Sequence, residues 1–98
     1  MTETREEVKW FAEQMERVLQ RNDYKGGWHN CSDEELFMHL LDEVRELYGN
    51  ITCIEGNAPI DECVDIANLA MMIADNRRRA RNGGARRCLT SGAIFSEC

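Results

Sequence analysis

Two pairs of carboxylates are the residues in this 98-residue chain whose types and spacing could do chemistry. Glu43 and Glu46 form the first pair, and Glu62 and Asp65 form the second. Residues three apart on a helix lie about 5–6 Å from each other on one surface, so each pair can present two carboxylates to the same partner. Hard divalent cations prefer oxygen ligands, and the four acids together would suit Mg²⁺ or Mn²⁺.

Both pairs are expected next to apolar packing faces, where ionised carboxylates are costly. Glu43 lies at the edge of the apolar face of a helix centred on Leu40. The second pair lies among isoleucine, leucine and methionine positions of a later helix, which has no Lys or Arg before Arg77. Like charges in such a place repel each other, so they stay together only if protons remain bound or a cation enters. We therefore expect the four acids to face one another across two antiparallel helices.

A solvated helix face is the alternative for either pair taken alone. Two such pairs on consecutive helices, the second in an apolar context, favour a site instead. A di-iron bundle is the competing metal centre, but it requires Glu-x-x-His motifs. His39 follows Glu35 by four residues, and His29 is expected in a loop, so that spacing is absent.

Two capping boxes predict the starts of the first two helices. Thr4 with Glu7, and Ser32 with Glu35, have the spacing at which each side chain can bond the backbone N–H of the other residue. Apolar residues then recur at helical spacing in both segments. We expect the first helix to end near residue 22, before a loop that contains two glycines.

The second helix is expected to end at Gly49, and the third to begin near residues 57–59 with Pro59 in its first turn. The third helix is apolar on nearly all sides as far as Asp75, which predicts burial on nearly all sides. Three helices of this length can hardly enclose one of their own. The predicted fold class is therefore all-α, a helical bundle of three main helices per chain completed by homo-oligomerisation as a homodimer or homotetramer.

The net charge of −6 is unevenly distributed, because the chain is acidic up to residue 76 and basic after it. We assign residues 1–81 to the helical domain and 82–98 to a C-terminal tail, whose weak periodicity leaves its order open. A DNA-binding domain carries its basic stripe on a folded face, so we do not expect nucleic acid as a partner of the main domain.

The sequence predicts a cytoplasmic protein with no contact to a membrane. No stretch approaches the roughly 18–20 apolar residues that span a bilayer, and the polar, acidic N-terminus predicts no signal peptide. The cysteines are odd in number and lack C-x-x-C spacing, which indicates free thiols in a reducing compartment. These cysteines are Cys31, Cys53, Cys63, Cys88 and Cys98.

The acidic motif also resembles a known family. The stretch "DEVRE" (42–46) followed by "ECVD" (62–65) resembles the E-E-x-x-E … E-x-x-D pattern of the MazG-like all-α nucleoside triphosphate pyrophosphohydrolases, over roughly residues 7–76. The pattern differs at Asp42, where the family has glutamate. The resemblance implies a four-helix-bundle-like MazG fold, with Mg²⁺ held by Glu43, Glu46, Glu62 and Asp65.

The implied reaction is hydrolysis of a (d)NTP between the α- and β-phosphates to (d)NMP and pyrophosphate, with house-cleaning of the nucleotide pool as the role. Glu46 and Glu43 are the catalytic candidates. We favour Glu46 as the general base, because it lies further from the packing face.

Four further residues are candidates for substrate binding, each with a structural alternative. Lys25 would contact a phosphate or a base edge, and Trp28 would either stack on the base or anchor its loop. Asn68 would hydrogen-bond the ligand or a neighbouring helix. Arg78 would reach a phosphate or belong to a solvated helix end.

The alternative function is a non-catalytic helical dimer that acts as an interaction module. In that case the Arg-rich tail would bind nucleic acid or an acidic partner. The sequence leaves open which base and sugar a substrate would carry.

Overall fold

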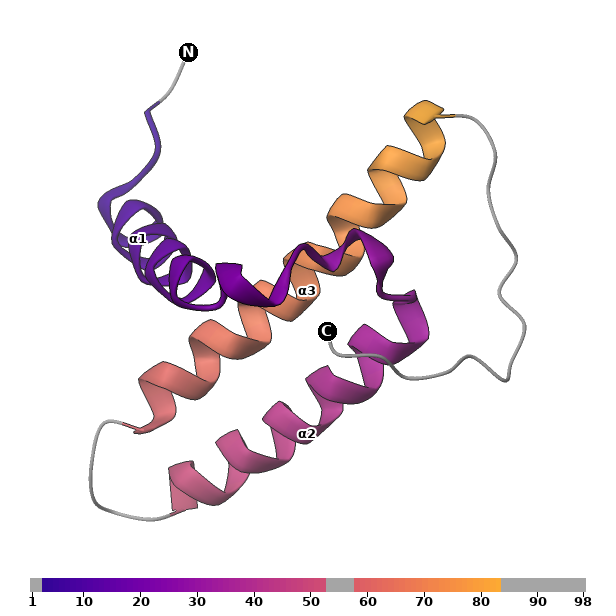
Figure 1. The fold of residues 1–98 in the computed structure, drawn as a ribbon. Helices are drawn as coiled ribbons and strands as arrows, with labels where there is room; N and C mark the ends of the chain where they lie inside the picture. Colours follow the sequence, from indigo (N-terminus) through magenta and orange to yellow (C-terminus); the bar gives the residue numbers. More distant parts are fainter. Residues whose placement is uncertain (1–2, 53–57, 84–98) are drawn as a thin grey trace.

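The computed structural model of the chain describes residues 3–52 and 58–83, and within these ranges it contains helices and no strand (Figure 1). The predicted all-α class with three main helices is therefore confirmed. These helices are α1 (Glu6–Arg21), α2 (Asp33–Thr52) and α3 (Ala58–Gly83), and two short 3₁₀ turns, η1 (Asp23–Lys25) and η2 (Trp28–Asn30), lie between α1 and α2.

Helices α2 and α3 form an antiparallel hairpin, and α1 crosses α3 at a steep angle (Figure 1). α1 packs against α3 and makes no close backbone approach to α2. The main apolar cluster lies where α2 and α3 meet the segment that directly follows η2. It contains Cys31, Leu36 and Leu69, with Leu40, Met72 and Ile73 packed against it.

The capping box at the start of α2 is confirmed. The backbone N–H of Ser32 donates to Glu35 Oε1 at 2.9 Å, and the backbone N–H of Glu35 donates to Ser32 Oγ at 3.0 Å. Both bonds satisfy donors that a helix start leaves without an intrahelical partner. These two bonds thus define the start of α2, where the segment from α1 enters.

The capping box predicted for α1 is wrong. Arg5 occupies the N-cap position in an extended conformation, and no side chain caps this helix. Because the helix begins at Glu6, Thr4 stands one residue outside the position from which its hydroxyl could reach the first turn. Sequence spacing alone did not distinguish this register from the neighbouring one.

The predicted end of the second helix at Gly49 is also wrong. α2 continues through Gly49 to Thr52, whose hydroxyl donates to the carbonyl of Gly49 at 2.8 Å. Glycine permits a left-handed conformation but does not require it, and a helix interior tolerates glycine at a cost of about 1 kcal/mol. The expectation for Pro59 is confirmed, because it is the second residue of α3.

Helix α3 is covered on only part of its surface by the single chain. Its buried residues contact α1, α2 and η2, whereas Ile60, Cys63, Ala70 and Ala74 are exposed. Burial on nearly all sides is therefore absent from one copy of the chain. Completion of the core by a second copy stays a prediction.

The remaining expectations from the sequence have mixed outcomes. Cys63 is free and exposed, as predicted, but Cys31 is disulfide-bonded, so the prediction of free thiols is wrong there because spacing along the chain says little about proximity in the fold. The other three cysteines and the tail from residue 84 lie outside the described residues. None of the described helices combines the length and apolarity needed to cross a membrane.

Candidate metal centre and adjoining pocket

Three of the four predicted acids converge between α2 and α3. Glu43 comes from α2, while Glu62 and Asp65 come from consecutive turns of α3. Each offers a carboxylate oxygen, and these three oxygens lie within 4.8 Å of one another. All three residues are partly buried. The antiparallel hairpin therefore creates a small, all-oxygen cluster, which we call the acidic triad.

Burial, together with charge repulsion, changes how the members of the acidic triad ionise. Burial raises the pKa of Glu43 to about 8, assisted by the contact with the Glu62 carboxyl and by the negative charges of Asp65 and Glu46. The pKa of Asp65 is raised as well, first by burial and then by the charge of Glu62. Without a cation, these shifts favour a proton shared within the triad. A divalent ion would compete with that proton.

Two oxygens of the acidic triad are shielded from water and receive no hydrogen bond from an N–H or hydroxyl group of the described residues. They are Oε1 of Glu43 and Oε1 of Glu62. A buried acceptor without a partner costs about 1–3 kcal/mol. Hard divalent cations bind carboxylate oxygens, so this donor set fits Mg²⁺ chemically, and equally Mn²⁺.

Glu46 lies outside the acidic triad, although it belongs to the same predicted motif. Its side chain is exposed, yet its charge raises the pKa of both Glu43 and Asp65, so it lies near them. Asp42, the position where the motif differs from the family pattern, is exposed and accepts a hydrogen bond from Arg45 at 3.2 Å.

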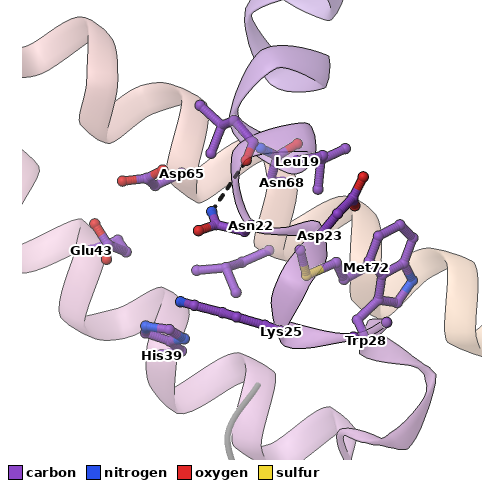
Figure 2. A pocket seen from close by; sticks show the side chains of 14 residues that line it. Leu19, Asn22, Asp23, Lys25, Trp28, His39, Glu43, Asp65, Asn68 and Met72 are labelled. Carbon is purple, nitrogen blue, oxygen red and sulfur yellow. Dashed lines mark hydrogen bonds between the residues drawn. The ribbon is translucent and has the colours of Figure 1, made fainter.

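A pocket of about 240 Å³ adjoins the acidic triad. Glu43 and Asp65 lie at one side of it, and Trp28 lies at the other (Figure 2). Lys25 extends from η1 across the pocket, and its ammonium end points toward Glu43 and His39 (Figure 2). The pocket thus joins an acidic end, one cation and an apolar end. Its other lining residues are Val18, Leu19, Asn22, Asp23, Gly26, Gly27, Asn68, Leu69 and Met72.

The loop that carries Lys25 is held in place by residues at the far end of α3. Trp28 Nε1 donates to Asp75 Oδ2 at 3.1 Å, and Asn76 Nδ2 donates to the carbonyl of Trp28 at 3.1 Å. These contacts give Trp28 an anchoring role, and its position in the pocket leaves stacking on a base as a prediction. Sequence reasoning missed Asp75 and Asn76, because their partners lie more than 40 residues away.

Arg78 is engaged elsewhere and does not line this pocket. Its Nε donates to Asp75 Oδ1 at 2.7 Å, and Arg79 Nε donates to Asp75 Oδ2 at 2.9 Å. The guanidinium groups of Arg79 and Arg78 hold the pKa of the Asp75 carboxyl below its ordinary value. Arg77 pairs with Asp33 at the start of α2. Arg77 therefore links α3 to α2, whereas Arg78 and Arg79 contact the carboxylate that holds Trp28.

Asn68 lies at the crossing of α1 and α3 and is only 3% exposed. Its Nδ2 donates to the carbonyl of Met15 in α1 at 3.3 Å, which fulfils the structural alternative considered for this residue. Its Oδ1 is buried and has no hydrogen-bond partner among the described residues. Asn68 also forms part of the pocket wall, one turn beyond Asp65.

Comparison of the chain with models of known protein families, with curated proteins and with solved structures finds no match. The family resemblance of the acidic motif therefore stays a prediction. The candidate site rests on the geometry of the chain itself.

Proposed function

We propose that this chain is a Mg²⁺-dependent nucleoside triphosphate pyrophosphohydrolase, which cleaves a (d)NTP between the α- and β-phosphates. The observation that carries the proposal is the convergence of three carboxylate oxygens within 4.8 Å at one end of a pocket. A site that can hold a cation thus adjoins a space that can receive an organic ligand. This arrangement supports the activity that the acidic motif implies.

The acidic triad would hold the metal, and the rest of the pocket would orient the nucleotide. Bound Mg²⁺ would supply positive charge for the phosphate oxygens and would lower the pKa of a water molecule. Lys25 would contact a phosphate at the acidic end, since it is the only cationic side chain among the lining residues described. Trp28, held by Asp75, would bound the base.

Glu46 is our candidate for the general base. It is exposed and lies outside the acidic triad, so its carboxylate would remain free to accept a proton from the attacking water. Glu43 would contribute as a metal ligand, because its carboxylate lies within the acidic triad. The division of roles follows the different environments of the two side chains.

We also propose that the chain acts as a homo-oligomer, which a row of exposed apolar residues on α2 supports. Phe37, Val44, Tyr48 and Ile51 are exposed, and with the partly buried Leu41 they follow an alternating four- and three-residue spacing, the pattern of a helix–helix seam. Tyr48 is 72% exposed and Ile51 is 62% exposed in the single chain. A second copy would remove this row from water.

The interaction-module alternative receives less support from the described residues. Arg77, Arg78 and Arg79 already pair with carboxylates of the same chain, so these arginines are engaged before any nucleic acid or acidic partner binds. House-cleaning of the cytoplasmic nucleotide pool remains the role that fits the proposed reaction.

Release of pyrophosphate tests the proposal directly. The purified chain is incubated with each common NTP and dNTP in the presence of Mg²⁺ or of EDTA. We expect pyrophosphate and monophosphate only with the metal, and loss of at least about a hundredfold in rate for Glu62→Gln. Glu13→Gln on the exposed side of α1 is the matched control and should react like wild type. Equal rates for Glu62→Gln and wild type would refute the assigned site.

A further inference from the structure

His39 is a polar side chain of the pocket wall that the fold itself does not use. It lines the pocket, it is exposed, and its ring makes no hydrogen bond or ion pair within residues 3–52 and 58–83. An imidazole ring offers at least one N–H donor in either tautomer and in either charge state. The pocket therefore contains a donor that a ligand can reach from the solvent side.

Helix α2 places His39 beside the acidic triad. His39 precedes Glu43 by about one helical turn, so the two side chains are neighbours on one face of the helix. The ring nitrogens of His39 nevertheless do not belong to the group of donor atoms that lie within 4.8 Å of one another in the triad. His39 thus borders the candidate metal centre without being one of its ligands.

Lys25 brings a second donor to the same part of the pocket from a different element. It extends from η1, and its ammonium end points toward His39 and Glu43 (Figure 2). Among the described residues it forms no ion pair with a carboxylate of the triad. The ring of Tyr24 lies 6.0 Å from its ammonium nitrogen, at the outer limit of a cation–π contact. The charge of Lys25 is therefore available to a ligand.

An ammonium and an imidazole from two separate elements suit a phosphate group. Each can donate to a different phosphate oxygen, and hydrogen bonds that involve charged groups are stronger than neutral ones. The carboxylates of the triad repel a phosphate unless a cation lies between them. In Figure 2 the two donors lie between Glu43 and Trp28. A nucleotide whose base lies near Trp28 would bring its first phosphate to them.

We propose that His39 is a phosphate-binding residue, which together with Lys25 holds the 5′-phosphate attached to the sugar of a nucleotide. The inference deepens the proposed function and rests on it for the identity of the ligand as a nucleotide. It assigns a role to a residue that the acidic motif does not include. In a triphosphate this group is the α-phosphate, so its contact with His39 would keep the bond to the β-phosphate beside the acidic triad.

The test compares each common nucleoside with its 5′-monophosphate, because neither molecule has a phosphoanhydride bond to hydrolyse. Affinities for the full chain are measured by NMR titration in the presence of Mg²⁺. For at least one base, we expect the monophosphate to bind wild type at least about tenfold more tightly than the nucleoside. In His39→Leu this affinity ratio should fall at least about fivefold, while the affinity for the nucleoside stays the same. An affinity ratio near one for every base in wild type, or an unchanged ratio in His39→Leu, would overturn the inference.

Further variants separate phosphate binding from a structural effect. His39→Arg keeps N–H donors at this position and should retain the affinity ratio of wild type. Lys25→Met should lower the ratio as His39→Leu does. Lys9→Met, which removes an exposed lysine of α1 that pairs with Glu6, is the matched control and should bind both ligands like wild type. Should His39→Leu fail to fold, the wild-type titrations and Lys25→Met still decide the matter.

The outcomes also separate this inference from the proposed function. Tighter binding of a monophosphate that depends on His39, without release of pyrophosphate from any triphosphate, would end the hydrolase proposal and leave the phosphate site standing. Release of pyrophosphate together with an affinity ratio that His39→Leu does not change would have the opposite meaning.

Discussion

Glu43→Gln tests the effect of burial and of repulsion within the acidic triad, because it replaces the carboxyl between α2 and α3 with a neutral amide of the same size. In wild type, burial and the neighbouring carboxylates raise the pKa of Glu43 from 4.5 to about 8. A carboxyl whose pKa is raised on folding contributes its full stability below pH 4.5 and loses it as the pH rises through about 8.

The size of the effect follows from the same two values. Each pKa unit corresponds to about 1.4 kcal/mol, so the difference between pKa values of 4.5 and about 8 limits the loss of unfolding free energy to ~5 kcal/mol. Water reaches part of the Glu43 side chain and screens its charge, so we expect ~2 kcal/mol. For a chain of 98 residues this corresponds to a change in Tm of about 10 °C.

Chemical denaturation at a pH of about 5 and of about 9 in EDTA, followed by circular dichroism, measures the difference. Wild type should lose ~2 kcal/mol of its unfolding free energy between these conditions, and Glu43→Gln should lose much less. Mg²⁺ at the higher pH should restore the stability of wild type and have a smaller effect on the variant.

Glu13→Gln removes one negative charge from the exposed side of α1 and is the control for net charge. It should follow the pH dependence of wild type. If Glu43→Gln also followed it, or if wild type gained stability toward high pH, the repulsion assigned to the acidic triad would be refuted.

Three further outcomes are expected. Asp75→Asn should lower Tm at neutral pH and expose Trp28 to solvent, which tryptophan fluorescence detects. Because the pKa of Asp75 is lowered on folding, the stability that its carboxylate contributes is present above pH 3.8 and is lost as the pH falls below that value. Ser32→Ala should cost ~1 kcal/mol in denaturation experiments, because it removes a helix cap. Tyr48→Lys should convert the oligomer into a monomer, as measured by sedimentation.

Matched controls exist for the last two outcomes. Thr4→Ala should leave stability unchanged, because no side chain caps α1. Tyr24→Lys changes an aromatic residue that is 80% exposed in η1 and should leave the oligomer intact. A monomeric wild type, or an oligomeric Tyr48→Lys, would contradict the role given to the exposed row on α2.

Local features were predictable where a short segment decides them. Apolar residues at helical spacing predicted the three helices, and the cap formed by Ser32 and Glu35 depends on four consecutive residues. The failures at Thr4 and Gly49 have the same origin, since each residue type permits a helix boundary without requiring one. Helix boundaries one or a few residues apart differ little in local free energy, so tertiary packing decides between them.

The site shows the same division between local spacing and tertiary contact. Spacing predicted that Glu62 and Asp65 share one helix surface, and the structure places them together with Glu43. Which members of the motif meet depends on the distance between α2 and α3 and on their relative shift along the axis. Neither quantity can be read from periodicity, so the sequence could not predict that Glu46 lies outside the acidic triad.

The sequence by itself determined the helical class, the acidic motif and the presence of Asn68 one turn after Asp65, because each depends on residue type and on neighbours within a few positions. Only the tertiary structure decided that Trp28 is held by Asp75 and that Asn68 Oδ1 has no donor among the described residues. These facts depend on side chains that meet across α1, η2 and α3. Their positions are set by the packing of whole helices, in which each contact constrains the others.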